Sequence, residues 1–348
     1  MELALYCPLC GYYEKKEDSP GKHGDFYTSV SVGPLFGQFL AFQFAEWLSE
    51  FGGRNAKRGI PASLQIVEAG AHDGRLAADI LEWLQRERPQ LFEQIEYCII
   101  EPSLRRREWQ TETLSKFTPH VRWFDTPHSA LRTPNAYTII FSNELLDAFP
   151  IHRFAWDADN RTWFELGVKL EGDRFVWARL LPARPSSIRH LPSSPELLAV
   201  LPDNFTTEVC PAAEAWWRDV ANSLTHGKLL TFDYGLSAEE FFLPQSANGT
   251  LRAYRNHQLA DDPLANPGEQ DLTAHVNFTA IQQAGENAGL KTESFTSQSQ
   301  FLTRIAEKLW RDKNCLGEWA PEQTRQFQTL THPNHLGRAF HALVQARD

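Results

Sequence analysis

The acidic residue Glu68 and the turn that follows it have the residue types and spacing of a site for a nucleotide-like ligand. The segment reads Glu68-Ala69-Gly70-Ala71-His72-Asp73-Gly74. A dinucleotide fingerprint would read G-x-G-x-x-G, with the pyrophosphate over the helix that follows. A carboxylate at this place repels a pyrophosphate but attracts the ammonium group of S-adenosylmethionine (SAM), which carries no phosphate. The segment therefore favours SAM over a dinucleotide. An ordinary strand-to-helix turn with a surface glutamate is the alternative.

A second acidic residue, Glu101, begins the sequence Glu101-Pro102-Ser103 and lies 31 residues after Gly70. It directly follows the apolar run 97–100. A carboxylate at the end of a second strand can accept hydrogen bonds from both hydroxyls of a ribose. We therefore expect Glu101 to bind the ribose of SAM and Glu68 to bind its ammonium group.

A third polar group follows the apolar run 137–141 and reads Ser142-Asn143-Glu144-Leu145-Leu146-Asp147-Ala148-Phe149-Pro150. Ligands of open α/β sheets bind at the carboxyl ends of strands, where this segment is expected to lie. Glu144 and Asp147 are three residues apart and could hold a cation between two carboxylates. Asn143 could orient a ligand, or it could simply cap a helix.

These three groups can only meet if strands and helices alternate along the chain. Ile66 and Val67 predict a buried strand, and Leu76, Ile80, Leu81 and Leu84 recur at helical spacing. The fold class is therefore α/β, with a Rossmann-like sheet. Further strands are expected at 97–100, 121–124, 137–141, 151–156, 163–170, 175–181, 228–232 and 291–295, with an antiparallel last strand at 337–345. Helices are expected at 212–224, 277–288, 298–311 and 321–330.

The chain divides into three predicted parts. Residues 1–60 form an N-terminal helical extension, whose aromatic helix around residues 36–51 is ended by Gly52-Gly53. Residues 61–150 and 226–348 form the SAM-binding Rossmann-like domain. Residues 151–225 form an inserted β-rich and helical substrate subdomain.

Composition limits the possible partners and compartment. The 348 residues carry a formal net charge of −10, which argues against nucleic-acid binding. No apolar run is long enough for membrane insertion, and the first residues have no leader-like composition. Cys7 and Cys10 have the spacing of half a zinc site, but no second pair completes it, so no metal is expected. Together with the scattered cysteines, these features predict a cytoplasmic protein.

The combination of motifs resembles the MidA-type SAM-dependent methyltransferases, a family that includes mitochondrial protein-arginine methyltransferases of complex I assembly. The motifs that carry this resemblance span nearly the whole chain. They are Leu5-Tyr6 with Gly11-Tyr12-Tyr13, residues 24–29, Leu35-Phe36-Gly37, Glu101-Pro102-Ser103, residues 143–150, Asp233-Tyr234-Gly235, Gly249-Thr250-Leu251 and residues 270–276. One departure is His72, which stands where the family usually has glycine and would crowd the amino-acid end of SAM.

The resemblance implies a class I methyltransferase sheet, SAM as cofactor and methyl transfer to a protein arginine. It suggests a respiratory-complex subunit as the protein substrate, and a homodimer is an open possibility. The candidate cofactor-binding residues are Asp25, Thr28, Glu68, Gly70, His72, Gly74, Glu101, Pro102, Ser142 and Asn143. The candidate catalytic residues are Asn143, Glu144, Asp147 and His152. The candidate substrate-binding residues are Asp233, Tyr234, His257, Asp271 and His275. The candidate proton acceptors are His152, Asp233, His257 and His275.

Two other functions remain open from the sequence. The protein could methylate another nitrogen or a small molecule, since Asn143-Glu144 loosely resembles the acceptor motif of amide and adenine methyltransferases. It could also be a non-catalytic assembly factor that binds a partner through its aromatic N-terminal helix and its β-rich insertion. The substitution at His72 favours that last hypothesis.

Overall fold

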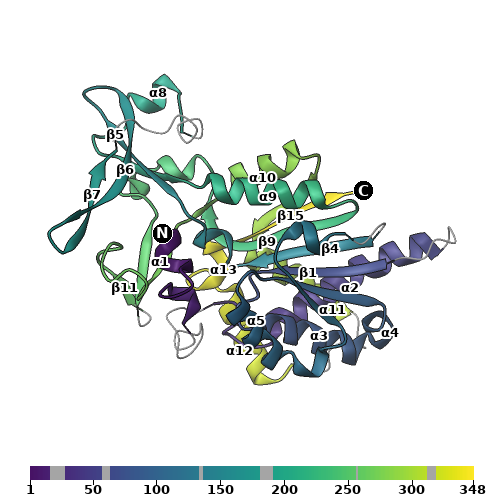
Figure 1. The fold of residues 1–348 in the computed structure, drawn as a ribbon. Coiled ribbons are helices and arrows are strands. Elements are labelled where there is room, and N and C mark those ends of the chain that lie inside the picture. Colours follow the sequence, from purple (N-terminus) through teal and green to yellow (C-terminus); the bar gives the residue numbers. More distant parts are fainter. Residues whose placement is uncertain (16–27, 57–62, 133–135, 181–190, 256–257, 312–318) are drawn as a thin grey trace. The chain divides into compact units, whose positions relative to one another are not determined.

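The structure, a computed structural model, describes residues 1–15, 28–56, 63–132, 136–180, 191–255, 258–311 and 319–348 (Figure 1). The chain divides into two compact units that are interleaved along the sequence. The larger unit comprises residues 19–145, 217–234 and 284–348. The smaller unit comprises residues 1–18, 146–216 and 235–283.

The larger unit is built on a mostly parallel sheet with the strand order β14-β15-β9-β4-β1-β2-β3. The parallel strands are β1 (Ser63–Ala69), β2 (Ile95–Ile100), β3 (Val121–Phe124), β4 (Ala136–Asn143) and β9 (Gly227–Leu236). The last strand, β15 (Phe340–Arg347), lies antiparallel between β9 and β14 (Lys291–Ser297). This arrangement confirms the predicted Rossmann-like α/β fold with an antiparallel last strand.

Apolar residues at helical spacing pack the helices of this unit onto the sheet. Its longer helices are α2 (Leu35–Ala56), α3 (Arg75–Glu87), α5 (Leu104–Thr113), α11 (Gln298–Arg311) and α12 (Pro321–Thr331). Its short helices are α4 (Pro89–Phe92), α6 (Pro127–Ala130), α13 (Leu336–Ala339) and the 3₁₀ turn η2 (Ser115–Phe117). Two helices, α9 (Pro211–Ser223) and α10 (Phe278–Asn287), run from the smaller unit into the larger one.

The aromatic helix α2 lies in the core of the larger unit. The ring of Phe44 lies 5.1 Å from that of Phe141 in β4, and the ring of Phe36 lies 5.4 Å from that of Phe232 in β9. Each fully buried phenylalanine contributes about 2 to 3 kcal/mol by removal of apolar surface from water. The helix therefore helps to hold the two central strands whose ends carry candidate site residues.

The prediction that Gly52-Gly53 end this helix is wrong, because α2 continues to Ala56. A glycine ends a helix when it adopts a left-handed conformation and its N–H bonds back to the last turn. Neither glycine has a positive φ, and in the described part of the chain no atom outside the adjacent residues and the helix backbone lies within 4 Å of the place where a Cβ would stand at either position. They are helix-interior glycines that lower helix stability by about 1 kcal/mol each relative to alanine.

The smaller unit contains two antiparallel sheets. The four-stranded sheet has the order β7-β6-β5-β8, formed by β5 (His152–Asp157), β6 (Thr162–Glu171), β7 (Arg174–Arg179) and β8 (Thr206–Val209). The three-stranded sheet consists of β10 (Arg252–Arg255), β11 (Gln258–Ala260) and β12 (Asp271–Thr273), and the sequence did not predict it. The remaining elements are α1 (Glu2–Tyr6), α8 (Pro195–Leu198), β13 (Val276–Asn277) and the 3₁₀ turns η1 (Tyr12–Glu14), η3 (Leu146–Ala148), η4 (Glu240–Phe242) and η5 (Pro244–Ser246).

Within the described ranges, no helix combines the length and the apolar composition that crossing a bilayer requires.

Candidate functional site

The carboxyl ends of β1, β2, β4 and β9 lie at one edge of the parallel sheet, and most of the predicted site residues of the larger unit lie there. The chain leaves β1 towards β2 on one side, whereas β4 lies on the other side of β1. Open α/β sheets bind ligands at such a reversal of strand order. Predictions for Asp25 and His257 lie outside the described residues.

The turn after β1 uses three residues with positive φ, at Gly70 (76°), His72 (47°) and Gly74 (85°). A Cβ at Gly70 would stand 2.9 Å from Leu145 Cδ1, the end of a flexible side chain that can move, so it is the positive φ that favours glycine there. His72 adopts the left-handed conformation that glycine usually supplies, which histidine does more readily than most residues. The backbone of the turn is therefore preserved at the one position where the sequence departs from the family pattern.

The side chain of His72 lies beside Asp73, with 3.9 Å between His72 Nδ1 and Asp73 Oδ1. Burial works to raise the pKa of Asp73, but its interactions with His72 and Arg75 outweigh burial and lower that pKa. Arg75 approaches the same carboxylate, at 2.9 Å from its Nε to Asp73 Oδ2. These contacts hold an ionised carboxylate at the start of α3.

Glu68 is buried in the sheet and only 3% exposed. The hydroxyl of Tyr97 on β2 donates a hydrogen bond of 2.6 Å to its Oε2. The pKa of Glu68 is raised to about 8, mainly by burial and to a lesser extent by the charges of Asp73 and Asp79, against the lowering effect of the hydrogen bond from Tyr97. The carboxyl is therefore protonated at neutral pH. A cation that bound there would have to displace that proton.

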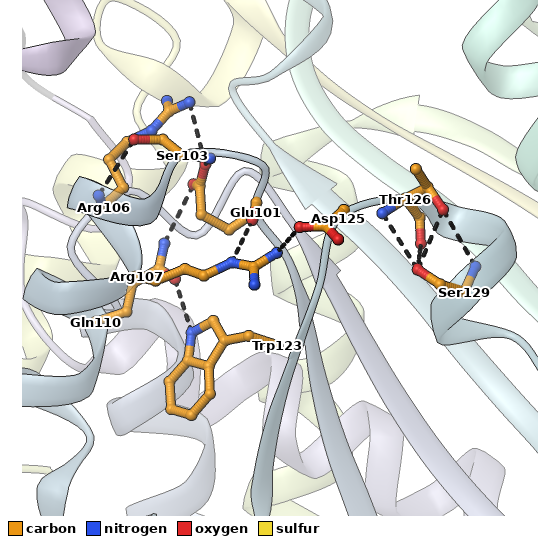
Figure 2. A network of polar contacts seen from close by, with 9 residues as sticks. All are labelled: Glu101, Ser103, Arg106, Arg107, Gln110, Trp123, Asp125, Thr126 and Ser129. Carbon is orange, nitrogen blue, oxygen red and sulfur yellow. Dashed lines mark hydrogen bonds and ion pairs between the residues drawn. The ribbon is translucent and has the colours of Figure 1, made fainter. Parts of the chain in front are cut away.

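Glu101 is the centre of a polar network at the end of β2 (Figure 2). Its Oε1 accepts a hydrogen bond of 2.9 Å from the Ser103 N–H and lies 3.1 Å from Arg106 Nη2. Its Oε2 accepts a hydrogen bond of 3.3 Å from Gln110 Nε2. Ser103 also caps α5, because its Oγ accepts from the Arg106 N–H at 3.3 Å. The network fixes the orientation of the carboxylate at the end of β2.

Gln110 connects two of the strand ends, and no sequence pattern predicted this role. Its Nε2 donates to the His72 carbonyl at 3.0 Å and to Glu101, and its Oε1 accepts from Trp123 Nε1 at 2.9 Å. The side chain is fully buried. A buried amide with three partners fixes the β1 turn relative to the end of β2.

At the end of β4, Glu144 has a φ of 50° and is held by several segments of the chain. Its N–H donates to the Phe232 carbonyl at 2.8 Å. Its Oε1 accepts from the Ser29 N–H at 3.2 Å and from Asn143 Nδ2 at 3.0 Å. Ser29 in turn donates through Oγ to Gln298 Oε1 at 3.1 Å. A non-glycine residue in this conformation marks a constrained strand end.

Asn143 does not cap a helix, since its amide bonds to Glu144 and the next element is the short turn η3. Its Oδ1 is buried and has no hydrogen-bond partner among the described residues. A buried acceptor of this kind is suited to a ligand donor. Thr28, whose Oγ1 accepts from the Ser31 N–H at 3.1 Å, forms the turn next to Ser29.

Ser142 and Asp233 support the backbone at this edge. Ser142 Oγ donates to Thr231 Oγ1 at 2.9 Å. The two oxygens of Asp233 accept from the N–H groups of Leu145, at 3.2 Å, and Tyr234, at 2.9 Å. Asp233 is fully buried. Their contacts hold the loop after β4 in place.

The smaller unit contains a separate group of buried acids and tyrosines. Asp147 and Asp271 are 5% and 6% exposed. The Tyr13 hydroxyl donates to Asp271 Oδ1 at 2.8 Å. Burial raises the pKa of Tyr13 well above its usual value, and the charges of Asp271 and Asp147 raise it further. Thr273 shares the face of β12 with Asp271, and its buried Oγ1 has no hydrogen-bond partner in the described parts of the chain.

Two further candidate residues of the smaller unit have defined partners. His152 Nδ1 lies 2.6 Å from Glu165 Oε1, and Glu165 is only 5% exposed. The backbone N–H of His275 donates to Thr250 Oγ1 at 3.2 Å.

The Gly249-Thr250-Leu251 motif surrounds a buried carboxylate. Glu208 Oε2 accepts from the N–H and Oγ1 of Thr250 at 2.7 and 3.0 Å. Gly249 has a φ of 74°, and a Cβ there would stand 2.2 Å from Glu208 Oε1. Arg153 Nε lies 3.3 Å from that same oxygen. The motif is therefore explained by packing around Glu208.

Comparisons with known proteins agree on one type of enzyme. A family model for S-adenosyl-L-methionine-dependent methyltransferases matches residues 39–296. The mitochondrial protein arginine methyltransferase NDUFAF7 homolog of Drosophila melanogaster is 28% identical, covering 99% of this chain and 79% of that protein. The human NDUFAF7 protein arginine methyltransferase is 25% identical, covering 98% of this chain and 77% of that protein. A Burkholderia thailandensis protein, crystallised with S-adenosyl-homocysteine bound, superposes with a TM-score of 0.82 and 32% identity, covering 99% of this chain and 86% of that one.

The prediction of a cytoplasmic protein is wrong by this comparison, because the fly, zebrafish and human relatives are mitochondrial proteins. The prediction rested on scattered cysteines and on the composition of the first residues. Free thiols indicate a reducing compartment but do not identify which one.

Proposed function

This chain belongs to the family of S-adenosyl-L-methionine-dependent methyltransferases, and on that premise we propose that it methylates a nitrogen of a protein arginine side chain. The family model covers most of the chain, and the Burkholderia relative is 32% identical over nearly all of it. The resemblance to the MidA-type family is therefore confirmed, and so is SAM as the cofactor. The arginine acceptor is supported by the names of the NDUFAF7 relatives.

The edge of the parallel sheet in the larger unit has groups that fit SAM. Gly70, with its positive φ, lets the backbone of the turn approach a ligand, and the buried Asn143 Oδ1 offers an acceptor for a ligand N–H group. We assign Glu101 to the ribose hydroxyls and Asn143 to the amino-acid end, where Glu68 joins it only when the ammonium group displaces the proton of its carboxyl. When bound, SAM supplies an electrophilic methyl group on its sulfonium. Gln110 keeps the carboxylate of Glu101 and the β1 turn in fixed relation.

The observation that carries the arginine assignment is the pair of buried carboxylates, Asp147 and Asp271, beside Tyr13 in the smaller unit. A guanidinium has planar donors that suit carboxylates, and it is attracted to the faces of aromatic rings. The ring of Tyr6 lies 5.5 Å from that of Tyr13, so two aromatic rings lie together at this place. The unpartnered Thr273 Oγ1 adds one more acceptor. The earlier pairing of Glu144 with Asp147 stays a prediction, since the two residues belong to different units.

Methylation of a guanidinium also requires a proton to leave, because the group is protonated below pH of about 12. His152 is the best candidate for this role. Glu165, 2.6 Å from its Nδ1, would stabilise the imidazolium that forms when the other ring nitrogen takes the proton. The dyad follows the general pattern of a base oriented by a carboxylate.

The test is methyl transfer from isotope-labelled SAM to a mixture of mitochondrial proteins, followed by mass spectrometry of the modified residues. Methylarginine is the expected product, and label found only on other residues or on small molecules would refute the arginine assignment. Asp271→Asn should reduce transfer about 100-fold, because a charged hydrogen bond of about 3 kcal/mol to the acceptor is lost. Its SAM affinity, measured by calorimetry, should stay within about twofold because the change leaves the sheet edge intact. The matched control is Asp261→Asn, at an exposed position of the same unit.

Two finer expectations about partners stay predictions: a respiratory-complex subunit as the acceptor, and a homodimer. The labelled acceptor in the same experiment would identify the first.

A further inference from the structure

Strand β7 forms an edge of the four-stranded sheet in the smaller unit (Figure 1). Within the described residues it pairs with β6 alone. The hairpin made by the two strands exposes apolar side chains, with Leu170 64% exposed, Val168 49% and Phe175 44%. Exposed edge strands offer unpaired backbone groups to other chains, so proteins either protect them or use them as interfaces.

The register with β6 determines which backbone groups of β7 point outwards. The Leu180 N–H donates to the Glu165 carbonyl at 2.8 Å, so Leu166 and Arg179 face each other as a non-hydrogen-bonded pair. Pairs alternate along an antiparallel ladder, so Val168–Trp177 and Leu170–Phe175 are of the same kind. The N–H and C=O groups of Phe175, Trp177 and Arg179 therefore point away from β6.

The side chains of these same three residues share one face of the sheet with Val168 and Leu170, because directly opposed residues point the same way. The Arg179 guanidinium lies 4.2 Å from the ring centre of Phe164. Its Nη1 also lies 2.9 Å from Asp157 Oδ2. The edge therefore presents two aromatic side chains and a positioned cation.

We propose that β7 pairs antiparallel with β7 of a second copy of this chain, about a two-fold axis at Val176. In such a pair, residues whose backbone N–H and C=O groups point away from β6 must lie opposite residues of the same kind in the second copy, so that these groups can form hydrogen bonds. The register centred on Val176 meets this condition. It places Phe175 opposite Trp177 of the second copy as a hydrogen-bonded pair. It also places Asp173, in the hairpin turn, opposite Arg179 of the second copy. The two-fold axis repeats each pair, as in other dimers of this symmetry.

Charge complementarity selects both the occupant and the register. The neighbouring register, with the two-fold axis at Trp177, also allows the backbone hydrogen bonds between the two strands. However, it places Phe175 opposite Arg179 of the second copy and leaves Asp173 with no positively charged residue opposite it. The chain as a whole carries a formal net charge of −10, and the resulting repulsion disfavours association of two copies. The hairpin is locally balanced, because Lys169 and Arg174 offset Glu171 and Asp173. Opposite-charge and aromatic cross-strand pairs are the contacts that stabilise such a ladder.

A cysteine cross-link tests the register directly. In the proposed dimer Val176 faces itself as a non-hydrogen-bonded pair, whose Cα atoms lie about 4.5 Å apart, within the range of a disulfide. The full chain with Val176→Cys should form a covalent dimer in oxidised glutathione, each new bond releasing two reduced glutathione molecules. Ala178→Cys, two residues along the same edge, should stay at the background of the unsubstituted chain. No cross-link at 176, or equal cross-linking at both positions, would overturn the proposal, and so would preferential cross-linking of Trp177→Cys.

Light scattering on a size-exclusion column tests the charge pair without added cysteines. Asp173→Arg places like charges opposite each other twice in the dimer, so the dissociation constant should rise at least about tenfold. The control is Asp159→Arg, the same charge change in the exposed turn between β5 and β6. A chain that stays monomeric up to about 100 µM, or a dimer that both variants weaken equally, refutes the proposal. If the chain is monomeric and binds an acceptor protein through β7, the proposed dimer is refuted and the edge strand is an interface for that protein.

Discussion

Replacement of Glu68 by glutamine should change how stability depends on pH. The folded carboxyl has a pKa of about 8, whereas the same group titrates near 4.5 in the unfolded chain. Between these values the folded state binds the proton that the unfolded state has released, so stability falls as pH rises. The loss approaches about 1.4 kcal/mol per pH unit within that window, or about 5 kcal/mol across it.

Glutamine cannot ionise, and its oxygen can still accept the hydrogen bond from Tyr97. The Glu68→Gln variant should therefore match the unsubstituted chain near pH 5 and exceed it by about 3 to 5 kcal/mol near pH 8. Urea unfolding followed by tryptophan fluorescence at several pH values measures this difference. Glu108→Gln, at an exposed position of α5, is the control. Parallel pH profiles for the Glu68 variant and the unsubstituted chain would refute the argument, because they would mean that Glu68 is already ionised in the fold.

Four other changes give distinct expectations. His72→Gly should change the free energy of unfolding by no more than about 1 kcal/mol, because it relieves a left-handed conformation but increases the entropy of the unfolded chain. The affinity for SAM, measured by calorimetry, should not fall. A large loss of affinity would mean that the imidazole binds the cofactor. Gln110→Ala should lower unfolding free energy by about 2 to 4 kcal/mol and weaken SAM binding together with it, because three buried hydrogen bonds are removed. Gly249→Ala should destabilise the smaller unit by more than about 2 kcal/mol, measured by thermal unfolding, because the new Cβ meets Glu208 at a positive φ. Glu144→Gln tests the predicted pairing of Glu144 with Asp147 around the acceptor: if the pairing holds, methyl transfer is abolished with SAM affinity nearly unchanged, and lost affinity would reassign that carboxylate to the cofactor.

Much of the sheet in the larger unit could be predicted from the sequence, because burial on both faces gives its strands continuous apolar runs. Residues 97–100 are of this kind, and the prediction matches β2 closely. The polar strand β10, Arg252–Arg255, has no such run. It is formed by pairing with β11 on one side and β12 on the other, and a short polar strand of this sort leaves little local pattern.

The environment of the site residues was harder to predict than their position. Glu68 stands at a strand end, as expected, but its burial under Tyr97 depends on the register that aligns Ile66 with Tyr97. Gln110 lies nine residues after Glu101 within a helix, and only the packing of α5 brings its amide to both strand ends. Such long-range alignments decide whether a carboxyl is ionised or neutral, and a single sequence does not contain them in readable form.

The interleaving of the two units has a consequence for biosynthesis. The contact from Ser29 to Gln298 and the insertion of β15 between β9 and β14 require residues from both ends of the chain. Before residues 298–347 have been synthesised, β9 lacks its antiparallel neighbour and the turn at Ser29 lacks Gln298. The sheet edge that we assign to SAM therefore reaches its final form only after residues 340–347 have been synthesised. Until then the nascent chain exposes apolar strands that a chaperone would have to cover.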